Sequence, residues 1–451
     1  MITLKPHQQR CAQEGYEIVK RNGVVMLVMQ TRTGKTYTAA EIIHMCGAKK
    51  VMWLSTKAAK KDQEKQIQEY GINIDVDYYH FGQMSGLPAN IAQDNTLSEP
   101  QRMKKRFALN KEIKKIISTK YDIVVVDEAH KVCQTPQEKT IEQIVLKELA
   151  DKYAPQYIML TATPTPEGAP SLFHILEATG RSPWKHSSFL SWVRAGYVIP
   201  ESIRTGQKLP NGKEITKTKY KKATRLVWGD VKHLYVTAQQ KEAGIKTEIK
   251  ERELVVKMSD YTEYLYRMLS KRRYLWIAGD YNTEVYGSTK AVLLSKLLQI
   301  TGGSVILSNK KHIILDKSKG IAIMRDMKCR EYKSAVIFYR FRSEREILRK
   351  TIPAHLLTEN PEDVQAGKKP IFIGQVKRFR EGVRFDNVDA MYLYTPDHSY
   401  LSYRQEKTRL QHMKRKKNPE LIWVISHIGY ERAVIAKVMK KKEFTNRWYN
   451  G

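Results

Sequence analysis

Two short segments of this 451-residue chain carry residue types that handle phosphate groups. The first, Gln-Thr-Arg-Thr-Gly-Lys-Thr at 30–36, combines a glycine with a lysine and a hydroxyl. The second, Val-Val-Val-Asp-Glu-Ala-His at 124–130, places two acids at the end of an apolar run. Gly34 permits close approach of backbone amides to phosphate oxygens, and the acids can hold a divalent cation and orient water. Together the segments predict one site for a nucleoside triphosphate.

The first segment supplies the phosphate ligands. Thr33 and Gly34 would form the loop, Lys35 would reach the β- and γ-phosphates, and the Thr36 hydroxyl would ligate Mg²⁺. The pattern is incomplete, because Met29 stands five residues before Gly34, where a phosphate loop usually carries its first glycine. A Gly-Lys-Thr tripeptide also arises by chance, so a basic turn before a helix is the alternative interpretation.

The acidic pair Asp127-Glu128 weighs against that alternative. Buried acids after β-branched residues are costly unless cations or hydrogen-bond donors meet them. The carboxyl end of a parallel strand is also where α/β sheets bind ligands. There Asp127 can hold Mg²⁺ and Glu128 can polarise the attacking water. Solvated carboxylates at an exposed strand end are the remaining alternative.

Short apolar runs predict the strands that position these residues. The run at 24–29 precedes the glycine loop, and a helical pattern begins at Tyr37, which is the order that a phosphate loop needs. Further runs lie at 51–54, 123–126 and 157–160. Continuous apolar runs are typical of strands buried on both faces of a parallel sheet. We therefore expect one doubly wound α/β domain over residues 1–185.

A second alternation of apolar runs and helical patterns predicts a second α/β domain over residues 331–451. Its expected strands lie at 334–339, 370–373, 390–394 and 421–425. Its expected helices lie at 343–350 and 430–442. The interval 186–330 is more basic and more helical, so we expect an insertion and a connection between the two domains.

One part of this interval predicts a basic hairpin. Residues 207–227 contain Asn211-Gly212, a strong hairpin turn signal. Lysines surround the turn, among them Lys213, Lys217 and Lys219. We expect the hairpin to meet a duplex or a fork junction, with a solvated surface loop as the alternative.

A cluster of aromatic residues follows later in the interval. Tyr274, Trp276, Tyr281 and Tyr286 could stack on unpaired bases. Packing in the core is the interpretation that we favour for them.

The charge balance indicates a polyanionic partner. Lys and Arg number 79 against 47 Asp and Glu, a formal net charge of +32. Self-repulsion of that size is tolerable when a polyanion lies against the surface, so nucleic acid is favoured over a basic enzyme with scattered lysines. The four cysteines form no C-x-x-C pair, which weighs against a disulfide framework or zinc ribbon. No apolar run approaches the length that spans a bilayer, so no membrane partner is expected.

The motifs resemble those of a known family. Asp-Glu-Ala-His at 127–130, with Thr-Ala-Thr-Pro at 161–164, is similar to motifs II and III of superfamily two helicases and translocases. Leu-Lys-Pro-His-Gln at 4–8 resembles the adenine-contacting motif that precedes motif I, which implies that Gln8 reads the base.

Other segments narrow the resemblance. The sequences at 165–176, 296–303 and 318–320 are more like the Swi/Snf-type branch than the DEAD-box branch. Among relatives, the chain is similar to phage-encoded helicases that act on branched DNA. A cytoplasmic location is expected, or the host cytoplasm if the chain is phage-encoded.

Later motifs imply the rest of the nucleotide site. Residues 380–385 are similar to motif V, which implies that Gly382 lies at the nucleotide. Residues 405–412 are similar to motif VI, which implies that Arg409 completes the ATP site as an arginine finger.

Motif VI departs from the family pattern. The family usually carries two arginines three residues apart, and this chain has Arg409 and then His412. A neutral histidine cannot fully replace an arginine, so either Arg409 serves alone or Arg404 or Arg415 contributes.

Two further segments match the positions of nucleic-acid contacts. Ser55-Thr56-Lys57 matches motif Ia, and Arg340 and Arg342 follow the strand of motif IV. Hydroxyl and basic groups there would hold phosphates without reading bases.

The resemblance implies two RecA-like domains with ATP and Mg²⁺ between them. It implies an ATP-dependent DNA motor, a DNA-stimulated ATPase that unwinds or remodels forked or branched DNA as a monomer. A double-strand translocase that never separates strands, an RNA helicase and a non-catalytic nucleic-acid binder with a decayed nucleotide site are the alternatives.

Overall fold

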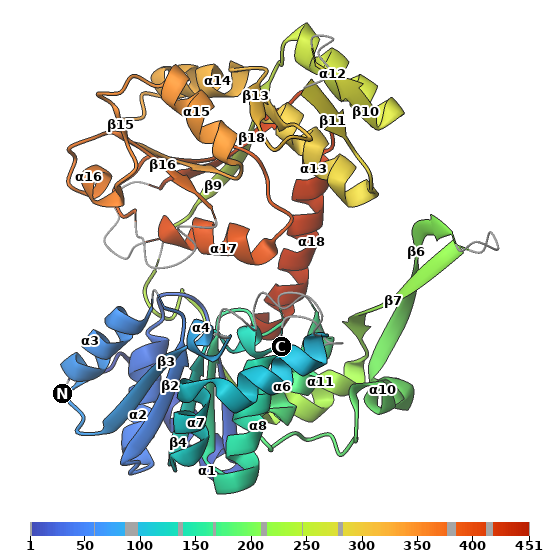
Figure 1. Ribbon diagram of the computed structural model, residues 1–451. Coiled ribbons are helices and arrows are strands. Elements are labelled where there is room, and N and C mark those ends of the chain that lie inside the picture. The colour runs from blue at the N-terminus through green and yellow to red at the C-terminus, as the bar shows by residue number, and fades with distance from the viewer. Residues whose placement is uncertain are drawn as a thin grey trace. The chain divides into compact units, whose positions relative to one another are not determined.

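The computed structural model describes the chain except residues 1, 58, 86–97, 134–138, 166–167, 209–213, 246, 278–282, 377–384, 412–417 and 451. The described residues form two compact units (Figure 1). Unit 1 comprises Met1–Gly244 with Thr445–Gly451, and unit 2 comprises Ile245–Phe444.

Unit 1 is built on a six-stranded sheet in which every neighbouring pair of strands is parallel. In spatial order its strands are β3 (Asp75–His80), β2 (Lys50–Ser55), β4 (Ile123–Asp127), β5 (Gln156–Thr161), β1 (Val24–Met29) and β8 (Tyr235–Ala238). The strands predicted at 24–29, 51–54, 123–126 and 157–160 are confirmed. All six residues of β1 are buried, as its unbroken apolar sequence requires.

Unit 1 also contains the helices that connect these strands and flank the sheet. They are α1 (Pro6–Asn22), α2 (Lys35–Met45), α3 (Lys60–Tyr70), α4 (Phe81–Ser85), α6 (Glu99–Leu109), α7 (Lys111–Ser118), α8 (Ile141–Tyr153), α9 (Leu172–Glu177), α10 (Phe189–Trp192) and α11 (Arg225–Val231). Asn110 and Thr140 begin α7 and α8 by accepting hydrogen bonds from backbone amides of the first turn. The core joins α1, α2 and β1 through apolar side chains such as Val19, Ile42 and Leu27.

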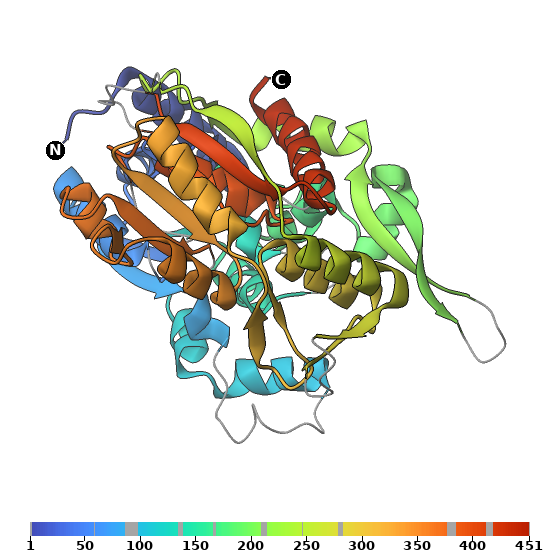
Figure 2. The same ribbon diagram turned by 90° about the horizontal axis from the view of Figure 1, so that it is seen from above.

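An antiparallel pair, β6 (Val198–Lys208) and β7 (Glu214–Ala223), overlaps the hairpin predicted within 207–227, but it begins at Val198, before the predicted range. Its turn lies outside the described residues. At the base, Trp192 stacks on Tyr197 with 5.2 Å between ring centroids, and Phe189 packs edge-on against Tyr220 at 5.3 Å. These rings fix the hairpin to α10, from which it projects in both views (Figures 1 and 2).

Unit 2 contains a second six-stranded sheet whose neighbouring strands are also all parallel. In spatial order its strands are β15 (Leu357–Thr358), β16 (Ile371–Gln375), β14 (Ala335–Tyr339), β17 (Ala390–Leu393), β18 (Glu420–Ser426) and β9 (Lys250–Val256). The strands predicted at 334–339, 370–373, 390–394 and 421–425 are confirmed. The α/β class with two doubly wound parallel-sheet domains is therefore confirmed.

Unit 2 carries its helices around this sheet and a smaller helical part between β9 and β14. The helices are α12 (Asp260–Arg272), α13 (Lys290–Thr301), α14 (Ser318–Cys329), α15 (Arg342–Thr351), α16 (Pro361–Gln365), α17 (Tyr400–Arg409) and α18 (Glu431–Asn450). Two antiparallel pairs accompany α12 and α13, namely β10 (Tyr274–Trp276) with β11 (Glu284–Tyr286) and β12 (Ser304–Ile306) with β13 (His312–Ile314). Leu265, Leu269 and Leu297 share a buried core with this part.

The units divide at Gly244 and Ile245, whereas the sequence placed domain boundaries after 185 and before 331. The difference arises from β8 and β9, which lie in the supposed insertion but complete the two sheets as edge strands. An edge strand need not be apolar throughout. The mixed sequence of β9, Lys-Glu-Arg-Glu-Leu-Val-Val, therefore gave no apolar run from which a strand could be predicted.

Two further expectations concern the whole chain. The four cysteines are free thiols, in line with the absence of a disulfide framework. Across the described ranges, the structure contains no helix that combines the length and the apolar character needed to cross a bilayer.

Candidate nucleotide-binding site and nucleic-acid surfaces

The glycine loop joins β1 to α2 and depends on one glycine. Gly34 caps the start of α2 with φ 88° and ψ 36°, a left-handed conformation that glycine adopts without steric cost. A Cβ atom at this position would lie 1.8 Å from Nε2 of Gln8. The left-handed backbone therefore favours glycine here, and a Cβ atom would also displace the Gln8 side chain.

Gln8 lies against this loop in the first turn of α1. It is buried, its Oε1 accepts a hydrogen bond from the Lys5 backbone N–H at 2.9 Å, and its Nε2 donates to the Thr33 carbonyl at 3.3 Å. Nε2 of His7 lies 2.9 Å from the same carbonyl. The structure thus brings the segment at 4–8 and the loop at 30–36 together.

The missing first glycine has a structural explanation. Met29 is the last residue of β1, its side chain is fully buried, and its carbonyl accepts a hydrogen bond from Nζ of Lys35 at 3.3 Å. The left-handed positions of the loop are instead Arg32, with φ 66°, and Gly34. Met29 keeps strand geometry, so a side chain fits where the usual pattern has glycine.

Lys35 and Thr36 are the first two residues of α2. Backbone N–H groups at a helix N-terminus lack intrahelical partners and carry partial positive charge, which favours anions. The loop therefore offers amide donors and an ammonium group to the same place, as phosphate binding requires.

The acidic pair meets the loop at the carboxyl edge of the sheet. Half-buried Asp127 ends β4, and its Oδ2 accepts a hydrogen bond from Nε2 of Gln63 at 2.6 Å. Burial and repulsion from Glu128 raise the pKa of Asp127 to about 6, although the charge of Lys35 opposes the shift. Two segments that are about ninety residues apart thus act on one another electrostatically.

Glu128 connects the acidic pair to the downstream motif. Its backbone is left-handed, with φ 55° and ψ 51°, which costs about 1–3 kcal/mol in a residue other than glycine. Its Oε2 lies 3.2 Å from Nδ1 of His130, which lies 3.3 Å from Oγ1 of Thr161. That hydroxyl oxygen accepts a hydrogen bond from the Thr163 N–H at 3.0 Å. The segments at 127–130 and 161–164 therefore form one polar chain.

The residues at this edge suit a nucleotide-bound Mg²⁺ ion. Carboxylate, hydroxyl and phosphate oxygens are the ligands that Mg²⁺ prefers. An acid whose pKa is raised by burial is stabilised in its ionised form by a bound cation. Asp127 and the hydroxyl of Thr36 are the residues that would hold the ion.

Two residues that support the site were not predicted. Gln63 comes from α3 and orients Asp127. Gln240 follows β8, where its backbone N–H donates to Oε1 of Gln30 at 2.9 Å and its side chain donates to the Thr31 carbonyl at 3.0 Å. Neither glutamine belongs to a recognisable spacing pattern, because each comes from a distant segment of the chain.

Arg409, the predicted arginine finger, belongs to unit 2. It is the last residue of α17, it is buried, and its guanidinium lies 5.3 Å from the ring centroid of Phe338 in β14. Arg404 lies on the same helix and is half-buried. Gly382, His412 and Arg415, which were predicted to accompany Arg409, fall outside the described residues.

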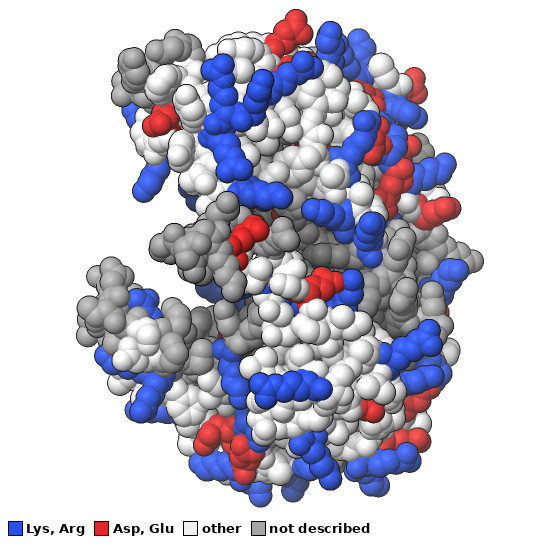
Figure 3. Space-filling view, turned by 90° about the vertical axis from the view of Figure 1, so that its right-hand side faces the viewer, with Lys and Arg blue, Asp and Glu red and all other residues white. Residues whose placement is uncertain are grey.

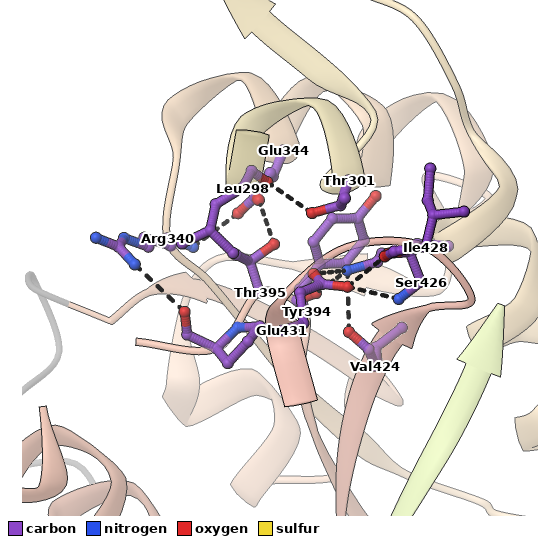
Figure 4. A network of polar contacts seen from close by, with 12 residues as sticks. Leu298, Thr301, Arg340, Glu344, Tyr394, Thr395, Val424, Ser426, Ile428 and Glu431 are labelled. Atoms are coloured by element: carbon purple, nitrogen blue, oxygen red, sulfur yellow. Dashed lines mark hydrogen bonds and ion pairs between the residues drawn. The ribbon is translucent and has the colours of Figure 1, made fainter. Parts of the chain in front are cut away.

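A buried polar network joins the carboxyl ends of the strands of the second sheet (Figure 4). Lys319 is fully buried, and its Nζ pairs with Glu431 at 2.7 Å and donates to the carbonyls of Tyr394 and Val424, both at 3.0 Å. Nearby, the carboxylate of buried Glu344 accepts hydrogen bonds from the Arg340 N–H at 2.8 Å, the Phe341 N–H at 3.0 Å and the Thr395 hydroxyl at 2.6 Å. Glu344 thereby fixes the loop after β14.

The two arginines of that loop, Arg340 and Arg342, differ in whether their charge is paired within the protein or faces solvent. Arg340 donates to the Pro396 carbonyl at 3.3 Å and lies 3.6 Å from Asp397. Arg342 is exposed and lines a cleft of about 650 Å³ with Lys310 and His312. Of the pair, Arg342 is the one whose charge faces an open cleft.

The predicted motif Ia contacts are also unequal. The hydroxyls of Ser55 and Thr56 are buried in the turn before α3, where the Thr56 oxygens accept from the Ala59 N–H. Lys57 is exposed. Only Lys57 therefore presents its side chain for a phosphate contact.

On the hairpin, Lys217 and Lys219 are exposed. They lie two residues apart on β7 and therefore point to the same face. Lys213 lies outside the described residues. Figure 3 shows Lys and Arg side chains spread over one face of the molecule, with fewer acidic groups among them.

No curated protein matches the chain. The crystal structure of the Hef helicase domain from Pyrococcus furiosus is similar with a TM-score of 0.48 and 12% identity, over 96% of this chain and 97% of that one. Residues 1–166 match the family model described as type III restriction enzyme, res subunit. That match spans Gln8, the glycine loop and the acidic pair.

Proposed function

We propose that the chain is an ATP-dependent DNA motor of the superfamily two type, a DNA-stimulated ATPase that translocates on forked or branched DNA and unwinds it. The observation that carries the proposal is the meeting of Gln8, Lys35 and Asp127 at one edge of the first sheet. That arrangement has the parts of a hydrolytic nucleotide site, and the matched family supports a helicase-type use for it.

In this proposal the residues divide the work as follows. Gln8 contacts adenine, Lys35 holds the β- and γ-phosphates, Thr36 and Asp127 hold Mg²⁺, and Glu128 orients the attacking water. The left-handed backbone and the His130 contact hold the Glu128 carboxylate in one place.

Unit 2 contributes Arg409 and, with Gly382, completes the ATP site. Lys57, Arg342, Lys217 and Lys219 hold the DNA backbone, which makes binding tolerant of sequence and sensitive to salt. Because the ATP-bound and ADP-bound states differ in their affinity for DNA, each cycle of hydrolysis alternates between tight and weak binding to the strand. We propose that the motor acts as a monomer.

The first test is Lys35→Ala. Loss of the ammonium removes a positive charge from the phosphates, and the steady-state ATPase rate with saturating DNA is expected to fall by about 10²-fold or more. Lys114→Ala, an exposed lysine on α7, is the matched control and keeps the wild-type rate. An undiminished rate in a folded Lys35→Ala protein contradicts the site.

A second experiment separates the proposal from its rivals. ATPase stimulation and strand displacement are measured on single-stranded, blunt, forked and four-way DNA and on the matching RNA. Stimulation by DNA with displacement of forked substrates supports the proposal. Stimulation by duplex without displacement indicates a double-strand translocase, and preferential stimulation by RNA indicates an RNA helicase.

A further inference from the structure

The β10–β11 pair of unit 2 carries aromatic side chains on its outer face. Tyr274, Trp276 and Tyr286 are 45%, 46% and 54% exposed, respectively. The interpretation of these three as core residues is therefore wrong. Tyr281, from the same cluster, lies outside the described residues.

The strand register explains the exposure. Tyr274 pairs with Tyr286 and Trp276 pairs with Glu284, so these four side chains share one face of the ladder. Leu275 and Val285 alternate with them and pack into the core with α12 and α13. Both helices lie beside the pair in Figure 1.

The outer face is unusual for a small antiparallel pair. Such a pair with one packed face normally places polar residues on the other. Here three of the four outward positions in the register are aromatic. Because an aromatic side chain can bury about 150–250 Å², leaving three at the surface forgoes a large hydrophobic gain unless a partner covers them.

The neighbouring charges indicate which partner fits. Lys271, Arg272 and Arg273 directly precede Tyr274, and all three are exposed. No ion pair of Arg272 or Arg273 is present among the described residues. Glu284, which is half-buried, lies at the Trp276 end, where its charge repels phosphate but not the face of a base.

We propose that Tyr274, Trp276 and Tyr286 form a stacking platform for the unpaired bases of a single-stranded nucleic acid. Aromatic rings next to cations are the combination that holds such strands, with bases on the rings and phosphates on the cations. The inference rests on the proposed function, since it assigns to unit 2 a share of the same substrate.

The geometry of the platform limits how bases bind. The rings of Tyr274 and Trp276 are 6.1 Å apart and inclined by 71°, so they cannot sandwich one base between parallel faces. Each ring instead offers a face to a different base. The ladder and the hydrogen bond from the Gly287 N–H to the Arg273 carbonyl, at 2.8 Å, hold the rings in position before binding.

The test replaces all three rings by alanine and measures binding without ATP. Fluorescence anisotropy gives the Kd for a labelled oligothymidine and for a blunt duplex of the same length. Since each lost ring removes a stacking contact with a base, single-strand affinity is expected to fall at least about tenfold while duplex affinity is unchanged. Trp276→Phe, which keeps a stacking face, should retain more single-strand affinity than Trp276→Ala.

Two controls make the outcome decisive. Tyr261→Ala/Tyr264→Ala removes two comparably exposed rings from the first half of α12 and should leave single-strand binding intact. Arg272→Gln/Arg273→Gln should lower the slope of log K against log salt by about 1.4 on single strands. The inference is overturned if the ring variants bind oligothymidine as the wild type does, if duplex binding falls equally, or if the α12 control loses as much.

The inference and the proposed function fail separately. Loss of single-strand binding in the ring variants supports the platform even if Lys35→Ala leaves ATPase activity intact. Conversely, if ATPase activity depends on Lys35 but single-strand affinity is unchanged in the ring variants, the proposed function is supported and the stacking platform is contradicted.

Discussion

At the scale of single residues, the site is decided by backbone geometry as much as by side-chain chemistry. The motif pattern predicted Lys35 and Asp127, because the glycine loop and the acidic pair are more specific in combination than either is alone. It could not identify Gln63 or Gln240, since one hydrogen bond from a remote segment leaves no pattern in the sequence. It also weighed Met29 as a departure, although that position keeps strand geometry and needs no glycine.

The raised pKa of Asp127 makes stability depend on pH. Its value of about 6 exceeds the ordinary 3.8, so between these values the folded protein binds more protons than the unfolded chain. Its contribution therefore falls as pH rises from about 4 to about 6 and is constant above that range. Asp127→Asn, which removes the buried charge, is expected to unfold at a higher temperature than the wild type above pH 6, with no such advantage near pH 4.

Thermal unfolding without nucleotide, measured from pH 4 to pH 8, checks this expectation. Glu148→Gln, which removes an exposed acid on α8, is the matched control and should show no comparable trend. Equal unfolding temperatures of Asp127→Asn and the wild type at pH 8 would contradict the electrostatic account.

At the scale of elements, the strands that are buried on both faces could be predicted from the sequence, whereas the edge strands could not. The central strands of both sheets are continuous apolar runs, and the Asn-Gly turn signal located the β6–β7 hairpin. The edge strands β8 and β9 were missed, because one face or edge of such strands tolerates polar residues. Tyr274 and Trp276 were misjudged because residue type alone does not reveal which face of a two-stranded ladder is packed.

The hairpin leads to a prediction about salt dependence. If Lys217 and Lys219 each neutralise one phosphate, Lys217→Gln/Lys219→Gln should lower the slope of log K against log salt by about 1 per lysine on duplex DNA. Lys222→Gln is the matched control, because Lys222 pairs with Glu201 at 2.5 Å on the same hairpin. Anisotropy titrations over a range of salt concentrations measure the slope, and an unchanged slope in the double variant places the hairpin away from the DNA.

At the scale of the whole molecule, the residues that we propose for the nucleotide site come from both units. Lys35 and Asp127 belong to unit 1, whereas Arg409 is buried in unit 2 beside Phe338. If Arg409 acts as the arginine finger, hydrolysis requires both units although unit 1 alone holds the phosphate loop. Arg409→Ala is then expected to lower kcat by about 10³–10⁵ with little change in nucleotide affinity, because the finger stabilises charge that develops in the transition state.

Single-turnover ATP hydrolysis and binding of a fluorescent ATP analogue separate these two quantities. Because Arg409 is buried, thermal unfolding must show that Arg409→Ala is folded, and Arg409→Lys provides a variant that keeps the charge. Arg330→Ala, an exposed arginine at the end of α14, controls for general loss of charge in unit 2. A folded Arg409→Ala protein that hydrolyses ATP within tenfold of the wild-type rate would mean that the catalytic cation comes from elsewhere. Arg404, on the same helix, is then the first alternative and is tested by Arg404→Ala. If Arg404 supplies the catalytic cation, hydrolysis still requires a residue of unit 2.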